Sequence, residues 1–335
     1  MTNLGYRPAA LILAPFEEKI LEELQDNLNI TYENWIETRV IHDQDSLKNK
    51  LSNNGTEILV IESDFVFEEV LDNVPSLKFI AICRNATNHV DLDSATKNGV
   101  IVVNSPGRNS NAVAEHTLGL MLSLSRNIHK GYNYVLNGKW TNPVDAYISL
   151  RGLELAGKTL GIIGLGSIGR RVGTICTSLG MTSIAYDPYI EDNSTEIPLI
   201  NLKDLLKKSD FISIHSPLTA ESRGLLGETE IAFMKPTAFL LNLSESAIVD
   251  QQALFSALRE NRIAGAALDV FETHPIIPNH PLLELDNVMF SPHLGGSTHE
   301  TIRRHSEIVV NNLSEFLQGK CPRNIVNPDV WNPNE

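Results

Sequence analysis

Three glycines and one carboxylate give this 335-residue sequence its clearest chemical signal. Gly164, Gly166 and Gly169 form the pattern G-x-G-x-x-G, which follows an apolar run and opens a helical pattern. In such a turn the glycines let backbone N–H groups and a helix N-terminus approach a pyrophosphate. Asp187 ends the next apolar run, where a carboxylate hydrogen-bonds a ribose 2′-hydroxyl and repels a 2′-phosphate. The motif therefore predicts a dinucleotide site that favours NAD over NADP.

A second carboxylate, Glu245, stands in the stretch F-L-L-N-L-S-E-S-A-I-V-D at residues 239–250. An apolar run ends there in a small polar turn, after which a helical pattern begins. Ligands of parallel α/β sheets bind at the carboxyl ends of the strands. We therefore expect Glu245 to lie in the active site, and the alternative is a solvated loop carboxylate.

The elements that must position these residues are short strands that alternate with helices. Apolar runs of about four to eight residues between helical patterns are typical of buried parallel strands in βαβ units. The sequence thus predicts an α/β protein with doubly wound parallel sheets. The runs expected to be strands are AALIL, EILVI, KFIAI, GVIVV, KTLGIIG, TSIAYD, DFISIH, AFLLN, AGAALDV and NVMFS.

Two turn clusters, V-N-S-P-G-R-N and S-P-H-L-G-G-S-T, indicate where the chain crosses between two domains. The first precedes a long helix predicted over about residues 111–129, with one of residues 109–111 as its cap. The second precedes an amphipathic helix predicted from about Thr298 to Leu317. A chain of this length is typical of two domains.

We expect the two turns to bound an inserted domain. Residues 1–106 and 296–335 would form a flavodoxin-like, substrate-binding domain, and residues 107–295 a Rossmann domain that binds the dinucleotide. A ligand is expected in the cleft between the two domains.

Composition excludes several functional classes. Hydrophobic residues make up 42% and charged residues 20% of the chain, as in soluble globular proteins, and we find neither a membrane span nor a signal peptide. The net charge of −14 disfavours nucleic acid and anionic membranes as partners. The separated cysteines Cys83, Cys176 and Cys321 indicate neither a disulfide framework nor a zinc site, which favours the reducing cytoplasm.

Several segments together resemble the D-isomer-specific 2-hydroxyacid dehydrogenase family, of the phosphoglycerate dehydrogenase-like type. The resemblance covers nearly the whole chain. It implies two doubly wound domains with NAD between them, and a homodimer whose contact comes from the helix at 111–129 and from residues 137–157. The segments that carry it are VDLDSATKNGVIVVNSPGRNSNAVAEHTLGLML, GKTLGIIGLGSIGRRV, HSPLTAESRGLL, VDQQALFSALRENRIAGAALDVFE, SPHLGG and PRNIVNP.

The resemblance also implies site residues. In this family a histidine moves the proton, and His293 in S-P-H-L-G-G matches it. The stretch from His215 would lie beside the adenosine and pyrophosphate, and Asp269 near the nicotinamide carboxamide; the alternatives are a buried histidine without a ligand role and a solvated carboxylate. Cofactor contacts are expected at Gly164, Gly166, Ser167, Ile168, Gly169, Asp187, His215, Pro217, Leu243, Asp269 and His293.

Two positions depart from the family pattern. Family members carry an arginine that anchors the substrate carboxylate, and Glu245 stands in its column. They also carry a glutamate that orients the histidine, and His274 stands there, with Glu272 two residues earlier. Two charges about 4 Å apart interact by roughly 4 kcal/mol at an effective dielectric constant of about 20, so an ordinary 2-keto acid should not bind in the usual pose. A metal site built from Glu245, His274 and His293 matches no known ligand spacing, and we predict none.

Other groups could hold the substrate's acid group. Candidates are Arg108 and the loop of Arg84, Asn85, Ala86 and Thr87, although either arginine could be an ordinary surface residue. Glu245 would then accept hydrogen bonds from substrate hydroxyl or amino groups. Trp140 could reach a neighbouring subunit, or belong to the dimer core.

The sequence therefore predicts an oxidoreductase that transfers hydride between NAD and a hydroxyl/carbonyl carbon. The substrate would be a D-2-hydroxy acid or a related polyhydroxy or phosphorylated acid, with Glu245, His274 and His293 as the catalytic set. The alternative is a catalytically silent NAD-binding regulatory or scaffold dimer.

Overall fold

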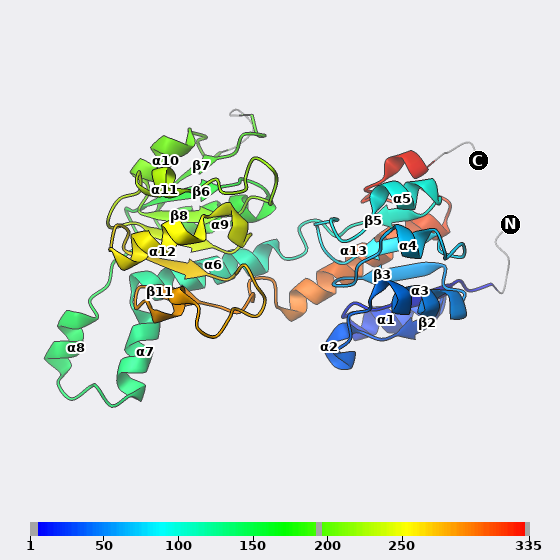
Figure 1. Ribbon diagram of the computed structural model, residues 1–335, viewed down its shortest axis with the longest axis horizontal. Helices are drawn as coiled ribbons and strands as arrows, with labels where there is room; N and C mark the ends of the chain where they lie inside the picture. The colour runs from blue at the N-terminus through cyan, green and yellow to red at the C-terminus, as the bar shows by residue number, and fades with distance from the viewer. Residues whose placement is uncertain (1–5, 192–195, 332–335) are drawn as a thin grey trace. The chain divides into compact units, whose positions relative to one another are not determined.

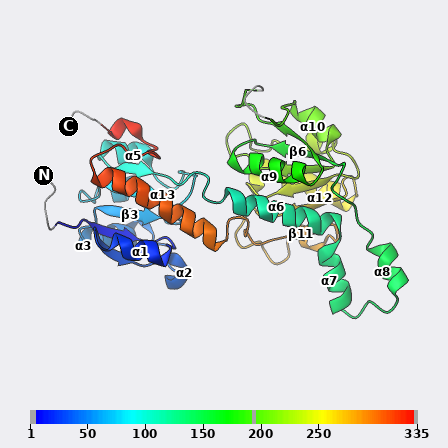
Figure 2. The ribbon, with the colours of Figure 1, turned by 180° about the vertical axis from the view of Figure 1, so that it is seen from behind.

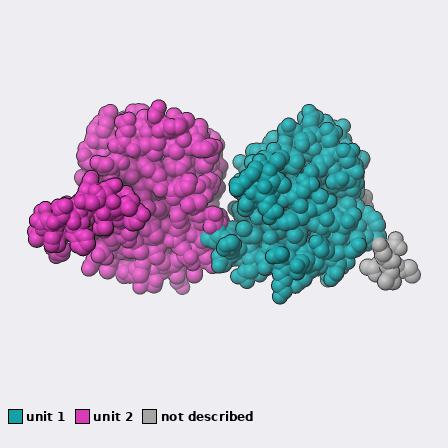
Figure 3. Space-filling model, turned by 90° about the horizontal axis from the view of Figure 1, so that it is seen from below, with its two compact units in different colours: residues 1–108, 298–335 teal, residues 109–297 magenta. Residues whose placement is uncertain are grey.

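The computed structural model describes residues 6–191 and 196–331, which form two compact units. Unit 1 comprises residues 1–108 and 298–335, and unit 2 comprises residues 109–297 (Figure 3). Each unit contains one parallel sheet with helices on both faces (Figure 1). The predicted α/β class with doubly wound sheets is confirmed.

The sheet of unit 1 has the strand order β2-β1-β3-β4-β5, and its paired strands are parallel. This order is the flavodoxin-like one. The strands are β1 (Ala9–Ile12), β2 (Asn29–Tyr32), β3 (Ile58–Ile61), β4 (Phe79–Ile82) and β5 (Ile101–Val103).

Helices from both ends of the chain cover this sheet. One face packs against α1 (Glu18–Leu24) and α13 (His299–Leu317), whose Val309 and Leu313 join the core of the N-terminal strands (Figure 2). Thr298 caps α13 as its N-cap residue, close to the predicted start. The other face packs against helices that precede β3, β4 and β5. The remaining elements of unit 1 are α2 (Trp35–Thr38), α3 (Gln44–Asn53), α4 (Glu68–Leu71), α5 (Leu92–Lys97) and η4 (Pro328–Val330).

The sheet of unit 2 has the order β11-β10-β9-β8-β6-β7. Beyond β7 the chain adds a single parallel bridge, Ala185 to Leu199, in the place of a third Rossmann strand. The strands are β6 (Thr159–Ile163), β7 (Thr182–Tyr186), β8 (Phe211–Ile214), β9 (Phe239–Asn242), β10 (Gly265–Leu268) and β11 (Val288–Phe290).

Two helical layers enclose the sheet of unit 2. On one face lie α6 (Ser110–Ser125) and α9 (Ser167–Ser178) (Figure 2). The other face is covered by α10 (Leu202–Lys208), α11 (Glu228–Ile231) and α12 (Gln251–Arg259). The remaining elements of unit 2 are α7 (Ile128–Leu136), α8 (Pro143–Ser149), η2 (Ser246–Ile248) and η3 (Pro281–Glu284). Within the described ranges, no helix is both long enough and apolar enough to cross a membrane.

The prediction of a single helix over residues 111–129 is wrong at the C-terminal end of that range. The structure ends α6 at Ser125 and starts α7 at Ile128. Asn127 between them has φ 52°, a left-handed conformation that asparagine adopts more readily than most residues. From this break α7, α8 and their connections leave the sheet as a projecting segment, here called the arm (residues 127–153) (Figure 1).

A buried ion pair joins the end of the first segment of unit 1 to its sheet. An Arg108 guanidinium nitrogen lies 2.6 Å from Glu62 Oε1 and 2.8 Å from His305 Nδ1. Because arginine only donates, the His305 ring accepts there and donates from Nε2 to the Pro15 carbonyl at 2.7 Å. Burial, followed by the charge of Arg108, lowers the pKa of His305 to about 4, which agrees with a neutral ring.

The carboxylate of this pair stays ionised. Burial alone raises the pKa of Glu62, but the charges of Arg108 and Arg84 and the Arg108 hydrogen bond lower it below its ordinary value. Its other oxygen accepts from Trp35 Nε1 at 3.1 Å. Such a group stabilises the fold above its unfolded pKa, and the stabilisation is lost as pH falls through the folded pKa.

Replacing Glu62 by glutamine should therefore lower the stability of unit 1 at pH 7 by about 3 kcal/mol, because it leaves Arg108 buried without a counter-charge. It should also flatten the loss of stability at acid pH. Urea unfolding followed by tryptophan fluorescence would measure both effects. The matched control is Arg323→Gln, which breaks an exposed pair with Glu315 and should cost less than about 1 kcal/mol. Equal effects of the two changes would contradict this prediction.

Candidate functional site

The glycine turn joins β6 to α9, and each glycine has a separate steric reason. Gly164 has φ 90°, and a Cβ there would lie 2.5 Å from the Ser216 nitrogen. A Cβ on Gly169 would lie 2.1 Å from the Gly164 carbonyl oxygen, so only glycine lets α9 pack this close. Gly166 is the N-cap residue, and a Cβ there would meet no atom within 4 Å. The open space at Gly166 is where a pyrophosphate would need to approach.

Asp187 is fixed beside this turn. It follows β7, and its two carboxylate oxygens accept from the Leu165 N–H at 2.8 Å and the Tyr189 N–H at 3.0 Å. Each oxygen keeps a further lone pair for a ligand hydroxyl. The side chain is half-buried, so it remains accessible from the turn.

His215 lies at the end of β8, against Gly164. Its Nε2 is 2.8 Å from the Ser213 hydroxyl, and burial lowers the pKa of His215 to about 3, so the ring is neutral. Its Nδ1 is buried without a hydrogen-bond partner within the described part of the chain. The neighbouring residues differ in exposure: Pro217 is exposed, whereas Leu243 is buried. An unsatisfied buried nitrogen at this edge of the sheet leaves a polar group for a ligand or water.

One carboxylate organises the loop that carries His293. Asp269, at the end of β10, accepts from the Ser291 hydroxyl and from the Leu294 and Gly295 N–H groups, both at 2.8 Å. These donors lie on both sides of His293, whose φ of 55° lies in the left-handed region that non-glycine residues adopt uncommonly. The clamp therefore holds the histidine in a conformation that the chain would otherwise avoid.

Asp269 is 1% exposed, which excludes the alternative of a solvated carboxylate. Burial alone raises the pKa of Asp269, but hydrogen bonds from His116, Ser291 and the two backbone N–H groups hold it below its ordinary value. His116 on α6 lies 3.0 Å from the Ser291 hydroxyl and 3.6 Å from the Asp269 carboxylate. The sequence analysis did not predict these roles of His116 and Ser291, because no local pattern indicates them.

His274 and His293 lie side by side. Their ring centres are 5.1 Å apart, with planes inclined by 49°, and the Phe271 ring lies 6.3 Å from His274. Both histidines are exposed, as is Glu272. The structure thus places an imidazole beside the proposed proton carrier, where the family pattern leads one to expect a carboxylate.

Glu245 lies at the same edge of the sheet. Its turn follows β9, which pairs with β10, so that Asn242 stands opposite Leu268, the residue before Asp269. The Asn242 side chain donates to the Glu245 carbonyl at 2.9 Å and accepts from the Ser244 N–H at 3.1 Å, which braces the turn. The Glu245 side chain is exposed. No cluster of three potential ligands suited to a metal ion occurs among the residues that the structure describes.

The predicted acid-binding residues belong to unit 1. Arg84, Asn85 and Ala86 form an exposed loop after β4, and the Arg84 guanidinium donates to the Ser63 hydroxyl at 3.2 Å. Arg108 is not a surface residue, because its guanidinium is held between Glu62 and His305.

Comparison with known proteins agrees with this arrangement. Residues 118–295, within unit 2, match the family model for the D-isomer specific 2-hydroxyacid dehydrogenase, NAD binding domain. Glyoxylate reductase of Thermofilum pendens is 41% identical over 279 residues, which cover 82% of this chain and 81% of the relative.

Solved structures extend the likeness to both units. The TT0316 protein from Thermus thermophilus superposes with a TM-score of 0.86 at 33% identity, over 95% of this chain and 99% of that chain. An acyclic imino acid reductase (Bsp5), solved in complex with NADPH and D-Arg, has a TM-score of 0.82 at 26% identity, over 95% of this chain and 99% of that chain.

The second and third glycines of the turn, Gly166 and Gly169, should respond differently to alanine. Gly166→Ala should leave the melting temperature nearly unchanged but weaken NADH binding at least about tenfold, or about 1.4 kcal/mol, because the methyl group points into open space that the dinucleotide needs. Gly169→Ala should destabilise unit 2 by about 1–3 kcal/mol through overpacking. Differential scanning calorimetry and NADH titration would measure both. Unchanged NADH affinity in Gly166→Ala would place the dinucleotide elsewhere.

Proposed function

Because the chain belongs to the D-isomer specific 2-hydroxyacid dehydrogenase family, we propose that it transfers hydride between NAD and the C2 carbon of a D-2-hydroxy acid with an unusual substrate anchor. The observation that supports this most strongly is the Asp269 clamp. It holds His293 in a left-handed conformation at the carboxyl edge of a sheet that also carries the glycine turn. A strained, braced histidine at this edge suits a proton carrier.

The proposed chemistry divides the work among this chain's residues. The bound nicotinamide supplies or accepts the hydride. His293 takes the hydroxyl proton when the substrate is oxidised and returns it when the carbonyl is reduced. Asp269 keeps the His293 backbone in place, and His274 packs against the ring. We assign the cofactor's pyrophosphate to the turn at Gly166 and its adenosine ribose to Asp187.

NAD rather than NADP is our proposal, and it rests on Asp187. Its carboxylate already accepts two backbone N–H groups and is fixed in place, so a 2′-phosphate would meet a negative charge that cannot turn away. The imino acid reductase with the same fold was solved with NADPH, so the fold itself accommodates either cofactor.

The substrate class follows from the exposed carboxylate of Glu245. It stands where related enzymes have an arginine, so a substrate group there should donate hydrogen bonds. We propose a polyhydroxy or phosphorylated D-2-hydroxy acid, whose hydroxyl groups contact Glu245. An amino-bearing substrate is the second choice, since the imino acid reductase was solved with D-Arg.

A silent NAD-binding regulator or scaffold is the second candidate function. The observation that favours it is the double replacement, in which Glu245 and His274 occupy the arginine and glutamate columns. A protein that no longer catalyses the reaction would be free to lose both the substrate-binding arginine and the glutamate that orients the histidine.

Hydride transfer separates the two candidates. Purified protein with NADH or NADPH should reduce at least one acid from a panel of glyoxylate, hydroxypyruvate, longer polyhydroxy 2-keto acids, and 2-keto acids with an amine. His293→Ala should lower kcat about a hundredfold or more with unchanged NADH affinity. Glu245→Gln should raise KM about tenfold, because it weakens charged hydrogen bonds.

The matched control is Glu228→Gln, an exposed carboxylate on α11, which should change neither constant. Silence across the whole panel, with NADH bound normally, would favour the regulator. Equal activity with NADPH would contradict the role of Asp187.

We also propose that the chain forms a homodimer through the arm. Large apolar side chains are exposed there, including Tyr132 at 66%, Trp140 at 59%, Tyr147 at 75% and Ile148 at 62%. Several large exposed apolar side chains on one projecting element are typical of an interface. A projecting element suits an isologous contact, in which each arm covers the other subunit.

Carboxylates on the arm should therefore break the dimer. The double variant Tyr147→Asp, Ile148→Asp should elute and scatter light as a monomer, because two charges cannot be buried unpaired in the interface. Leu179→Asp, at an exposed apolar position outside the arm, is the control and should keep the mass of the unchanged protein. An unaltered mass in the double variant would move the interface elsewhere.

A reducing compartment, the cytoplasm, is proposed on separate grounds. All three cysteines carry free thiols, and Cys83 and Cys176 are buried, where no partner cysteine can reach them.

A further inference from the structure

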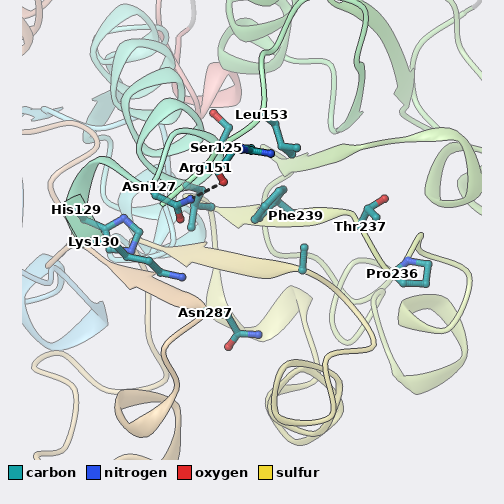
Figure 4. Close-up of a pocket in the computed structure, with 13 residues that line it drawn as sticks. Ser125, Asn127, His129, Lys130, Arg151, Leu153, Pro236, Thr237, Phe239 and Asn287 are labelled. Carbon is teal, nitrogen blue, oxygen red and sulfur yellow. Dashed lines mark hydrogen bonds between the residues drawn. The ribbon is translucent and has the colours of Figure 1, made fainter. Parts of the chain in front are cut away.

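Unit 2 contains a hollow at the edge of its sheet where the strands begin, opposite the edge that carries the glycine turn. It measures about 350 Å³ and opens beside the first residues of β9 and β10 (Figure 4). Because the strands are parallel, their starts and ends lie at opposite edges of the sheet. The hollow is therefore separate from the edge that carries Asp187, His215 and Asp269. Its size is within the usual range for small-molecule sites.

The walls of this hollow come from the two roots of the arm and from the starts of the strands. Asn127 Nδ2 donates to the Leu150 and Arg151 carbonyls, both at 3.4 Å, as the dashed line in Figure 4 shows for one of them. The Leu153 N–H donates to the Ser125 carbonyl at 2.7 Å. These bonds tie the outgoing and returning segments of the arm together, so the walls are formed before any ligand binds.

Positive charge gathers at the hollow, although the protein as a whole carries −14. Lys130 and Arg151 both line it, and no aspartate or glutamate does so within the described part of the chain. Neither cation belongs to an ion pair with any residue that the structure describes. Arg151 lies over the Tyr147 ring, 5.4 Å from its centre, at the rim.

His129 also lines the hollow. Its Nδ1 lies 3.3 Å from the Ser123 carbonyl, to which it donates. Burial, and then the charge of Lys130, lower the pKa of His129 despite that hydrogen bond. The ring is thus neutral at neutral pH, and Lys130 and Arg151 carry the site's permanent charge.

The rest of the lining is apolar or neutral. The half-buried Phe239 ring lies within the group of lining residues, between the arm roots and Thr237 (Figure 4). Leu124 and Leu153 add apolar surface, and Asn287 adds an amide. A hollow that combines apolar surface with two cations and no carboxylate is complementary to an anion that carries a compact apolar body.

We propose that this hollow binds a small organic anion, with its carboxylate or phosphate facing Lys130 and Arg151 and its apolar body against Phe239. Such a ligand joins the arm roots to the strand starts. Because the ligand binds only when the arm roots lie against the strand starts, it stabilises this native arrangement against local unfolding of the arm. The site lies apart from the proposed reaction and does not depend on it.

Calorimetric titration of the full-length protein with benzoate and with phenyl phosphate tests the proposal, with NADH present and absent so that binding at the dinucleotide site is recognised. Both probes should bind under both conditions, and the uncharged analogue benzamide should bind at least about tenfold more weakly. Lys130→Ala and Arg151→Ala should each raise Kd about tenfold, as expected for the loss of one charge-assisted hydrogen bond. Lys130→Arg, which keeps the charge, should retain most of the affinity.

The matched control is Lys139→Ala, which removes a cation from the same arm outside the hollow and should leave Kd unchanged. Melting temperature and NADH affinity show whether each variant is folded. The proposal is overturned if neither probe binds, if both alanine variants bind like the unchanged protein, or if Lys139→Ala weakens binding equally. Failure of the hydride-transfer assay would leave this result untouched.

Discussion

The hydrogen bonds of one buried carboxylate determine the geometry of the proposed reaction centre. Asp269 receives three donors from the loop that contains His293, and two of them are backbone N–H groups that no side-chain change could supply. A buried carboxylate is costly unless its lone pairs are filled, so the loop and the carboxylate stabilise each other. His116, reaching in from α6, connects this pair to the helical layer. The orientation of the proton carrier thus depends on contacts made by residues that do not themselves react.

Around this centre stand side chains that differ from those that the family resemblance leads one to expect. The clamp is fully hydrogen-bonded, and the exposed positions that we propose to meet a substrate carry Glu245 and His274. Conserving the framework while changing the exposed groups is the pattern expected when an enzyme changes its substrate, because the framework sets rate and the exposed groups set binding. The arrangement argues for altered specificity more than for lost chemistry.

Local patterns in the sequence predicted most of the fold, and long-range pairing accounts for what they missed. Every apolar run assigned as a strand is a strand in the structure, because buried parallel strands are apolar on both faces. β2, with the sequence N-I-T-Y, was missed because it is a half-exposed edge strand. The helix break at Asn127 carries no proline or glycine signal. Arg108 was predicted as a possible substrate anchor, but it forms a buried ion pair with Glu62. The two residues are far apart in the sequence, so no local pattern indicated this contact.

The position of α13 has a consequence for biosynthesis. Val309 and Leu313 complete a core whose other members, such as Ile12 and Phe79, belong to the first segment of the chain. A ribosome releases that first segment early, but the face of its sheet that α1 and α13 share is covered only in part until the last helix emerges. The inserted unit 2 contains all of its own strands and helices and is able to fold first. Completion of the N-terminal sheet therefore has to wait for the end of synthesis, whereas unit 2 needs no later segment of the chain.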